Sequence, residues 1–215
     1  MKKSFIIATG LFISLAGISK AQDAYEDNRA KPALGLKVGL NRSNVYDEQG
    51  QDFKANAKMG FVGGAFVAIP IGKFLGVQPE ALISQKGYKA TGTLLGTSYS
   101  DTRTTTYLDI PLQLQLKPVD FITLLAGVQY SYLLHQNDIY AFGANSNAQD
   151  QEFKNDNARK NIFGAIVGAD VNVGHFVFSL KACWDLQNNA GDGSSYTPRY
   201  KNVWLQGTIG FRMYN

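Results

Sequence analysis

Cysteine, histidine and long apolar runs are all scarce in this sequence of 215 residues. Cys183 is the only cysteine, so no disulfide can form within the chain. No stretch after the first 21 residues has 18 apolar residues in a row, so we expect no transmembrane helix. His135 and His175 are the two histidines, and they are predicted at opposite strand ends, which argues against a metal site built on histidine.

An excess of charge of one sign is also missing once the first residues are set aside. Residues 1–21 contain Lys2 and Lys3, an apolar run and small residues before Ala21, which predicts a secretory signal peptide. Removing the three lysines of that segment from the 21 Lys and Arg leaves 18 bases against 17 acids. We therefore expect no nucleic-acid partner. The polar residues 22–32 are predicted to form a short periplasmic lead-in.

Alternation of apolar and polar residues is abundant in the rest of the chain. From Leu108 to Leu116 every second residue is Leu or Ile, with mostly polar residues between them. A period of two predicts a strand with one apolar and one polar face. Pro111 interrupts this strand because it has no N–H to donate, and we expect a local bulge there. The same pattern predicts eight strands, over residues 33–41, 59–69, 74–88, 102–117, 121–134, 159–171, 176–187 and 202–214.

The connections between these strands alternate in length. Long polar loops are predicted at residues 42–58, 89–101, 135–158 and 188–201, and short turns at 70–73, 117–120 and 172–175. Bacterial outer-membrane barrels have this asymmetry, with short periplasmic turns and long outer loops. Residues 33–215 are therefore predicted to be one all-β domain, an eight-stranded antiparallel up-and-down transmembrane β-barrel in the outer membrane, with both termini periplasmic. A soluble eight-stranded barrel would alternate similarly, but its outer face would carry more charge than these strands do.

The charged residues of the polar faces are predicted to form a network inside the barrel. An eight-stranded barrel is just wide enough for side chains to fill it, and a buried charge without a partner is very costly. Four bases and four acids fall on the polar faces, which indicates a plugged lumen rather than an open pore. They are Lys37, Lys86, Lys181 and Arg212, and Glu80, Asp109, Asp170 and Asp185.

Aromatic residues cluster near the strand ends and predict two interfacial girdles. The girdle on the loop side would contain Tyr88, Tyr107, Tyr130, Tyr132 and Trp184, and the girdle on the turn side Phe74, Phe121, Phe176, Phe211 and Tyr214.

Four short motifs resemble the PorT-like family of small outer-membrane β-barrel proteins. They are Gly60-Phe61, Val77-Gln-Pro-Glu80, Ser84-Gln-Lys-Gly87 and Tyr107-Leu-Asp-Ile-Pro-Leu112. The resemblance implies an exported outer-membrane barrel from a Gram-negative bacterium. The motifs themselves say little about activity. The role expected for the barrel is structural or interactive, in envelope integrity, in binding through the loops or in a secretion or assembly complex, and the family's namesake is associated with a protein-secretion system.

No pattern in the sequence predicts an enzyme or a cofactor. Ser131 and His135 lie four residues apart on one predicted strand face, roughly 13 Å from each other, which is too far for a nucleophile and its base. No glycine-rich phosphate loop is present between a strand and a helix. The alternatives to a structural role are a narrow channel for small or apolar solutes and a soluble periplasmic ligand-binding barrel. The expected partners are outer-membrane lipid and envelope proteins that contact the four long loops.

Overall fold

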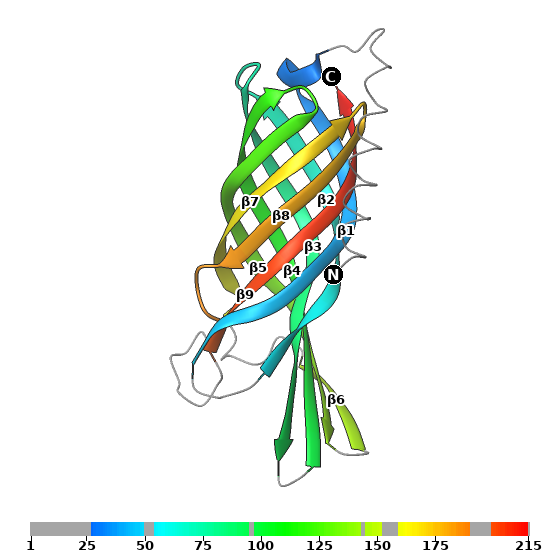
Figure 1. The fold of residues 1–215 in the computed structure, drawn as a ribbon, viewed down its shortest axis with the longest axis vertical. Helices are drawn as coiled ribbons and strands as arrows, with labels where there is room; N and C mark the ends of the chain where they lie inside the picture. Colours follow the sequence, from blue (N-terminus) through cyan, green and yellow to red (C-terminus); the bar gives the residue numbers. More distant parts are fainter. Residues whose placement is uncertain are drawn as a thin grey trace, which may run out of the picture.

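The computed structural model describes residues 27–49, 54–94, 97–142, 145–151, 159–189 and 199–214. The predicted signal peptide, residues 1–21, lies outside the described residues. A short 3-10 helix, η2 (Asn28–Ala30), precedes nine strands (Figure 1). The strands are β1 (Ala33–Gln49), β2 (Lys54–Pro70), β3 (Leu75–Leu94), β4 (Thr97–Val119), β5 (Ile122–Phe142), β6 (Asn145–Gln151), β7 (Asn161–Val173), β8 (Phe176–Asp185) and β9 (Arg199–Tyr214).

Eight of these strands close into an antiparallel ring. Consecutive strands pair around the ring, with β5 pairing with β7 and β1 with β9, so the order is β1-β2-β3-β4-β5-β7-β8-β9. This confirms the predicted eight-stranded up-and-down barrel. β6 is an additional strand, which pairs with β5 at residues 136–142, beyond the part of β5 that pairs with β7. We call the interior of this ring the lumen.

Three of the four predicted long loops are wrong over much of their length, because strands run through them. β1 and β2 occupy most of residues 42–58, β3 and β4 most of 89–101, and β5 and β6 much of 135–158. The paired strands β3–β4 and β5–β6, which we call the hairpins, extend well past the barrel at one end (Figure 1). We call this end of the barrel the hairpin-side mouth. The apolar–polar alternation is absent from these segments because their outward face contacts water rather than lipid, although inward residues such as Val45, Ala90 and Asp138 are buried.

The opposite end, which we call the turn-side mouth, has short connections. They lie at residues 71–74, 120–121 and 174–175, close to the predicted turns. Gly174 has a φ of 57°, a left-handed conformation that glycine adopts without steric cost. Ala33 pairs with Tyr214, so the barrel's first and last strands begin and end at this mouth. Within the described residues, no helix is long and apolar enough to cross a membrane.

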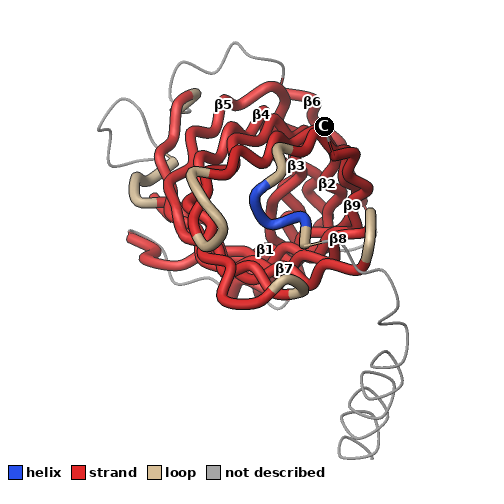
Figure 2. The backbone as a smooth tube through the Cα atoms, turned by 90° about the horizontal axis from the view of Figure 1, so that it is seen from above, coloured by secondary structure: helices blue, strands red, loops and turns tan. Residues whose placement is uncertain are grey.

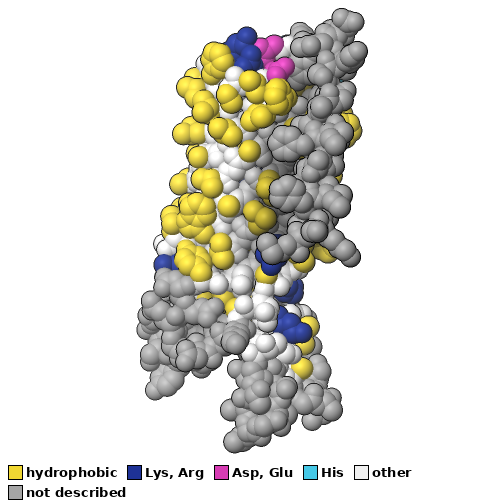
Figure 3. Space-filling view, viewed as in Figure 1, with side chains coloured by type: hydrophobic (Ala, Val, Ile, Leu, Met, Phe, Trp, Pro, Cys, Tyr) yellow, Lys and Arg dark blue, Asp and Glu magenta, His cyan; other side chains and the backbone are white. Residues whose placement is uncertain are grey.

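The barrel has its apolar side chains outside and its polar side chains inside. Phe61 is 72% exposed and Leu114 is 64% exposed, whereas Lys86, deep in the lumen, is 1% exposed. Figure 3 shows hydrophobic side chains over the wall between the two mouths. A soluble barrel requires the opposite arrangement, and an exposed apolar surface of this extent indicates contact with lipid.

The strand Tyr107–Lys117 has the predicted faces but lacks the predicted bulge. Ile110, Leu112 and Leu114 point outward, while Asp109 and Gln113 are buried in the lumen. The pairing of β4 with β5 runs without a shift through Pro111. On the other edge, the pairs Pro79–Leu112 and Leu82–Asp109 share one register, so a bulge at Pro111 is wrong. Pro111 lies where the β3–β4 ladder is interrupted, and Pro79 lies in a separate interruption of the β2–β3 ladder, between the pairs Phe66–Glu80 and Ile69–Val77.

Candidate functional site

The centre of the lumen is occupied by a cluster around Glu80. Its Oε1 atom accepts hydrogen bonds from Lys37 Nζ at 2.7 Å, from Lys181 Nζ at 2.8 Å and from Gln78 Nε2 at 2.7 Å. We call Lys37, Glu80 and Lys181 the Glu80 cluster. Glu80 is on β3 and Lys181 on β8, which are four strands apart in either direction around the ring. The Glu80–Lys181 bond therefore spans the barrel from wall to wall.

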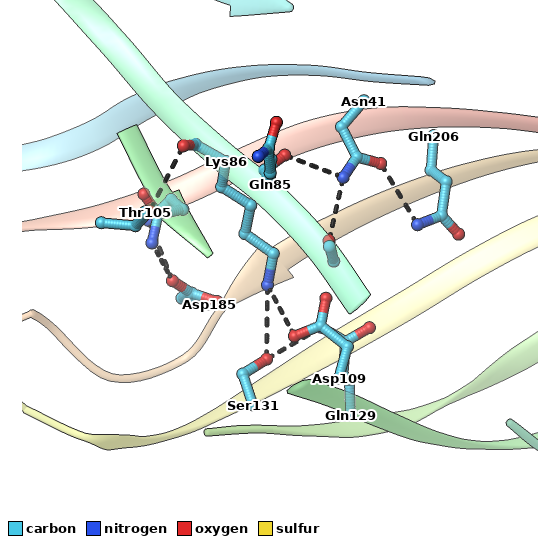
Figure 4. Close-up of polar contacts among 11 residues, drawn as sticks. Asn41, Gln85, Lys86, Thr105, Asp109, Gln129, Ser131, Asp185 and Gln206 are labelled. Carbon is cyan, nitrogen blue, oxygen red and sulfur yellow. Dashed lines mark hydrogen bonds and ion pairs between the residues drawn. The ribbon is translucent and has the colours of Figure 1, made fainter. Parts of the chain in front are cut away.

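A second cluster lies nearer the hairpin-side mouth and is centred on Lys86. Its Nζ atom lies 3.0 Å from Asp109 Oδ1 and 3.3 Å from Ser131 Oγ (Figure 4). The same ammonium group lies 3.8 Å from the centre of the Trp204 ring and 4.6 Å from that of Tyr107. Aromatic faces attract cations and exclude water, so they favour the buried charge of Lys86.

The other predicted members of the charge network have separate surroundings. Asp170 accepts a hydrogen bond from Ser179 Oγ, and Asp185 accepts one from Asn202 Nδ2 at 2.5 Å. Both acids are buried. Arg212 is only half-buried, lies at the turn-side mouth and forms no salt bridge within the described part of the chain. Arg212 does lie on the inward face of β9, as predicted, but it is near the end of that strand and therefore away from the other charged residues of the network.

The hairpin-side mouth is crossed by a contact that sequence patterns did not predict. Arg103 on β4 binds Asp138 on β5 through two parallel bonds of 2.7 and 2.8 Å. Its Nη1 atom also donates to the hydroxyl of Tyr200 on β9, the strand opposite β4, at 3.1 Å. Tyr88 packs edge-on against Tyr200 with ring centres 5.2 Å apart, and burial raises the pKa of its hydroxyl. Asp138 and Tyr200 lie in predicted loops, where no alternation indicates a face.

The turn-side mouth is covered by the segment that contains η2. Lys117 Nζ donates to the carbonyl oxygen of Arg29 at 2.9 Å, and Arg29 Nη1 donates to the carbonyl oxygens of residues 117 and 118. Asp27 binds both Arg29 and Lys73, and the hydrogen bond from the Arg29 side chain keeps the pKa of Asp27 below its usual value. Viewed along the barrel, η2 lies within the outline of the ring (Figure 2).

The aromatic girdle predicted for the loop side is wrong for two of its residues. Tyr88 and Tyr107 are buried and face the lumen, because strand alternation places them beside Lys86 and Asp109. Trp204 and Phe66 also line the lumen, and Lys37 Nζ lies 4.6 Å from the Phe66 ring centre. On the turn side, four predicted girdle residues are exposed, namely Phe74, Phe121, Phe176 and Phe211.

Ser131 and His135 do not share a strand face. The register of β5 against β4 shifts between Leu133 and His135, which leaves one extra residue on β5. Ser131 is consequently buried beside Lys86, while His135 is exposed. Over the described ranges, no group of three or more His, Cys, Asp or Glu side chains could hold a metal ion.

Taken as a class, a closed eight-stranded barrel with an apolar outer wall and an ion-paired lumen is an integral outer-membrane barrel. The family comparison agrees with this class. The model for the outer membrane protein beta-barrel domain matches residues 21–191, and the chain belongs to that family. Membership of this family implies an outer-membrane location.

Several solved structures are similar to this chain. Ail, the attachment invasion locus protein of Yersinia pestis, is 12% identical, with a TM-score of 0.46, over 85% of this chain and 99% of that one. Neisserial surface protein A is 8% identical, with a TM-score of 0.47, over 83% and 97%. OprG from Pseudomonas aeruginosa is 12% identical, with a TM-score of 0.45, over 86% and 98%. No curated protein sequence matches the chain.

Proposed function

We propose that this protein is a non-conducting outer-membrane barrel that presents its hairpins as a binding surface. The observation that supports a closed lumen is the Glu80 cluster, whose ion pairs connect opposite walls at the middle of the barrel. The Arg103–Tyr200 contact crosses the hairpin-side mouth, and the η2 segment covers the other. A solute would have to displace all three.

The alternative is a narrow channel, and one observation favours it. The Gln113 carboxamide is fully buried in the lumen, and neither its nitrogen nor its oxygen bonds to the protein. Buried polar groups of this kind usually bind water. A hydrated lumen could conduct if its charged side chains moved apart.

Conductance measurement distinguishes these two functions. The refolded barrel, inserted into a planar lipid bilayer, should give no steady single-channel openings, because the Glu80 cluster blocks the centre. A conducting porin inserted in the same bilayer provides the control for detection. Steady openings of the unmodified protein would show that the lumen is a channel.

We also propose that the hairpins face the cell exterior and contact other envelope components. Short turns of bacterial barrels lie on the periplasmic side, which assigns the long hairpins to the outside and both chain ends to the periplasm. Ile139, on β5 beyond the outward apolar residues of the barrel wall, is 40% exposed, as a binding residue on a hairpin would be. The PorT-like assignment belongs to this proposal. Its motifs supply Glu80, Lys86 and Asp109 to the lumen, and the role of that family's namesake in secretion would make this barrel part of a complex.

A crosslinking experiment tests the binding surface. A photo-reactive amino acid at Ile139 should give crosslinked products of discrete mass in intact cells, because this side chain projects from a protruding strand. The same amino acid at Gly72, an exposed turn residue at the other mouth, serves as the matched position. Equal labelling at both positions, or none at Ile139, would contradict the proposed hairpin surface.

A further inference from the structure

A small pocket lies at the turn-side mouth, between the η2 segment and the ends of the barrel strands. Its enclosed volume is about 20 Å³, which holds one water-sized atom such as a single oxygen of a larger oxyanion, and the pocket opens to solvent, where the rest of that ion would lie. Residues of the η2 segment line one side of the pocket, and Lys117 and Arg212 line the side formed by the barrel.

The charges around this pocket are unequal. Four bases line it, Arg29, Lys31, Lys117 and Arg212, against the single acid Asp120. Asp27 balances Arg29 through side-chain bonds of 2.8 and 2.9 Å. Lys117 and Arg212 alone outnumber the one lining acid, so the pocket favours an anion.

Specific hydrogen-bond donors are available to such an anion. Arg212 Nε is buried and has no hydrogen-bond partner. Lys117 Nζ donates to the carbonyl oxygen of Arg29 at 2.9 Å, which is one hydrogen bond from a group with three N–H bonds. A buried arginine N–H without an acceptor is costly, and an oxyanion is the ligand whose geometry a guanidinium group matches best.

Two other residues that line the pocket have acceptor atoms, which favour a ligand that can also donate a hydrogen bond. Gln115 Oε1 and Asn172 Oδ1 are buried acceptors without a protein partner. An oxyanion that still carries a proton could donate to one of them while it accepts from Arg212. A phosphate monoester, whose second pKa is about 6, exists partly in this form near neutral pH, and a phosphodiester headgroup such as that of phosphatidylglycerol offers its glycerol hydroxyls as donors instead.

We propose that the pocket formed by the η2 segment, Lys117 and Arg212 is a binding site for a phosphate group. The group is either free phosphate or the headgroup of an anionic lipid, because both offer the same oxygens to the two bases. This site is independent of whether the lumen conducts.

Thermal unfolding of the full mature protein tests the site. In neutral detergent at constant ionic strength, replacing chloride with inorganic phosphate should raise the melting temperature saturably, by roughly 5–10 °C at ~100 times the dissociation constant. Arg212→Gln should abolish the rise, whereas Arg42→Gln, at an exposed position on β1, should keep it. Lys117→Gln provides the same test if Arg212→Gln does not fold.

A second experiment, in lipid vesicles, distinguishes free phosphate from a lipid headgroup. The protein is refolded into phosphatidylcholine vesicles with and without phosphatidylglycerol. Stabilisation by phosphatidylglycerol that depends on Arg212, without an effect of free phosphate, assigns the site to a lipid headgroup. The proposal is overturned if neither form of phosphate stabilises the protein, or if Arg212→Gln is stabilised as much as the parent.

Discussion

Replacing Glu80 with alanine should lower the free energy of unfolding of the barrel by about 3–5 kcal/mol, the usual cost of removing one partner from a buried ion pair. Glu80 accepts hydrogen bonds from Lys37 and Lys181, both of which are almost completely buried. Without the carboxylate, two ammonium groups face each other in the lumen. The urea concentration at the midpoint of unfolding, measured on barrels refolded in detergent micelles, reports the change.

A triple variant separates the loss of charge balance from the loss of packing. Lys37→Met, Glu80→Leu and Lys181→Met together remove the whole cluster and keep most of its volume. Replacing a complete buried ion cluster with apolar side chains is often neutral or stabilising, so this variant should unfold near the parent. If Glu80→Ala itself unfolds at the parent's urea concentration, water in the lumen must screen the two lysines, and the closed-lumen proposal loses its main support.

The sequence predicted the barrel wall well because two different environments impose a period of two on each strand. Leu112 and Gln113 illustrate the rule, since one is exposed on the outer wall and the other is buried in the lumen. Past the apolar wall, the outward face of a strand contacts water instead of lipid, so the apolar–polar alternation ends even though inward residues such as Ala90 and Asp138 stay buried. The extensions of β3, β4 and β5 were therefore predicted as loops, although their backbones pair as regularly as those of the wall.

The alternation along each strand predicts which side chains face the lumen. It does not predict which of those side chains contact each other. Lys181 and Glu80 are 101 residues apart and meet because β3 and β8 lie opposite each other, which depends on closure of the ring. The alternation also does not predict how far along the barrel axis an inward side chain lies. Arg212 and Lys181 share the inward face of their strands, yet one lies at the mouth and the other at the centre. For Tyr107, its place in the alternation decides the side of the wall that it faces, although an aromatic residue was expected at the membrane interface. Its ring packs against the Lys86 ammonium group inside the lumen.

The second large effect is expected on the outer wall. Leu112→Arg should cost about 2–4 kcal/mol of folding free energy in a phospholipid bilayer, because the side chain would enter the hydrocarbon near its midplane. Leu112 is 54% exposed and lies between other outward apolar residues of β4, away from both mouths. Unfolding by guanidinium in vesicles, followed by tryptophan fluorescence, measures this cost.

Leu75 provides a control of matched exposure at a different depth. It is also 54% exposed, but it begins β3 beside the turn at residues 71–74. Arginine near a bilayer interface costs only about 0–1 kcal/mol, so Leu75→Arg should be close to the parent. Equal costs at the two positions would indicate a loss of packing that is independent of depth. No cost at Leu112 would mean that the apolar wall contacts water, and the assignment of this face to lipid would be wrong.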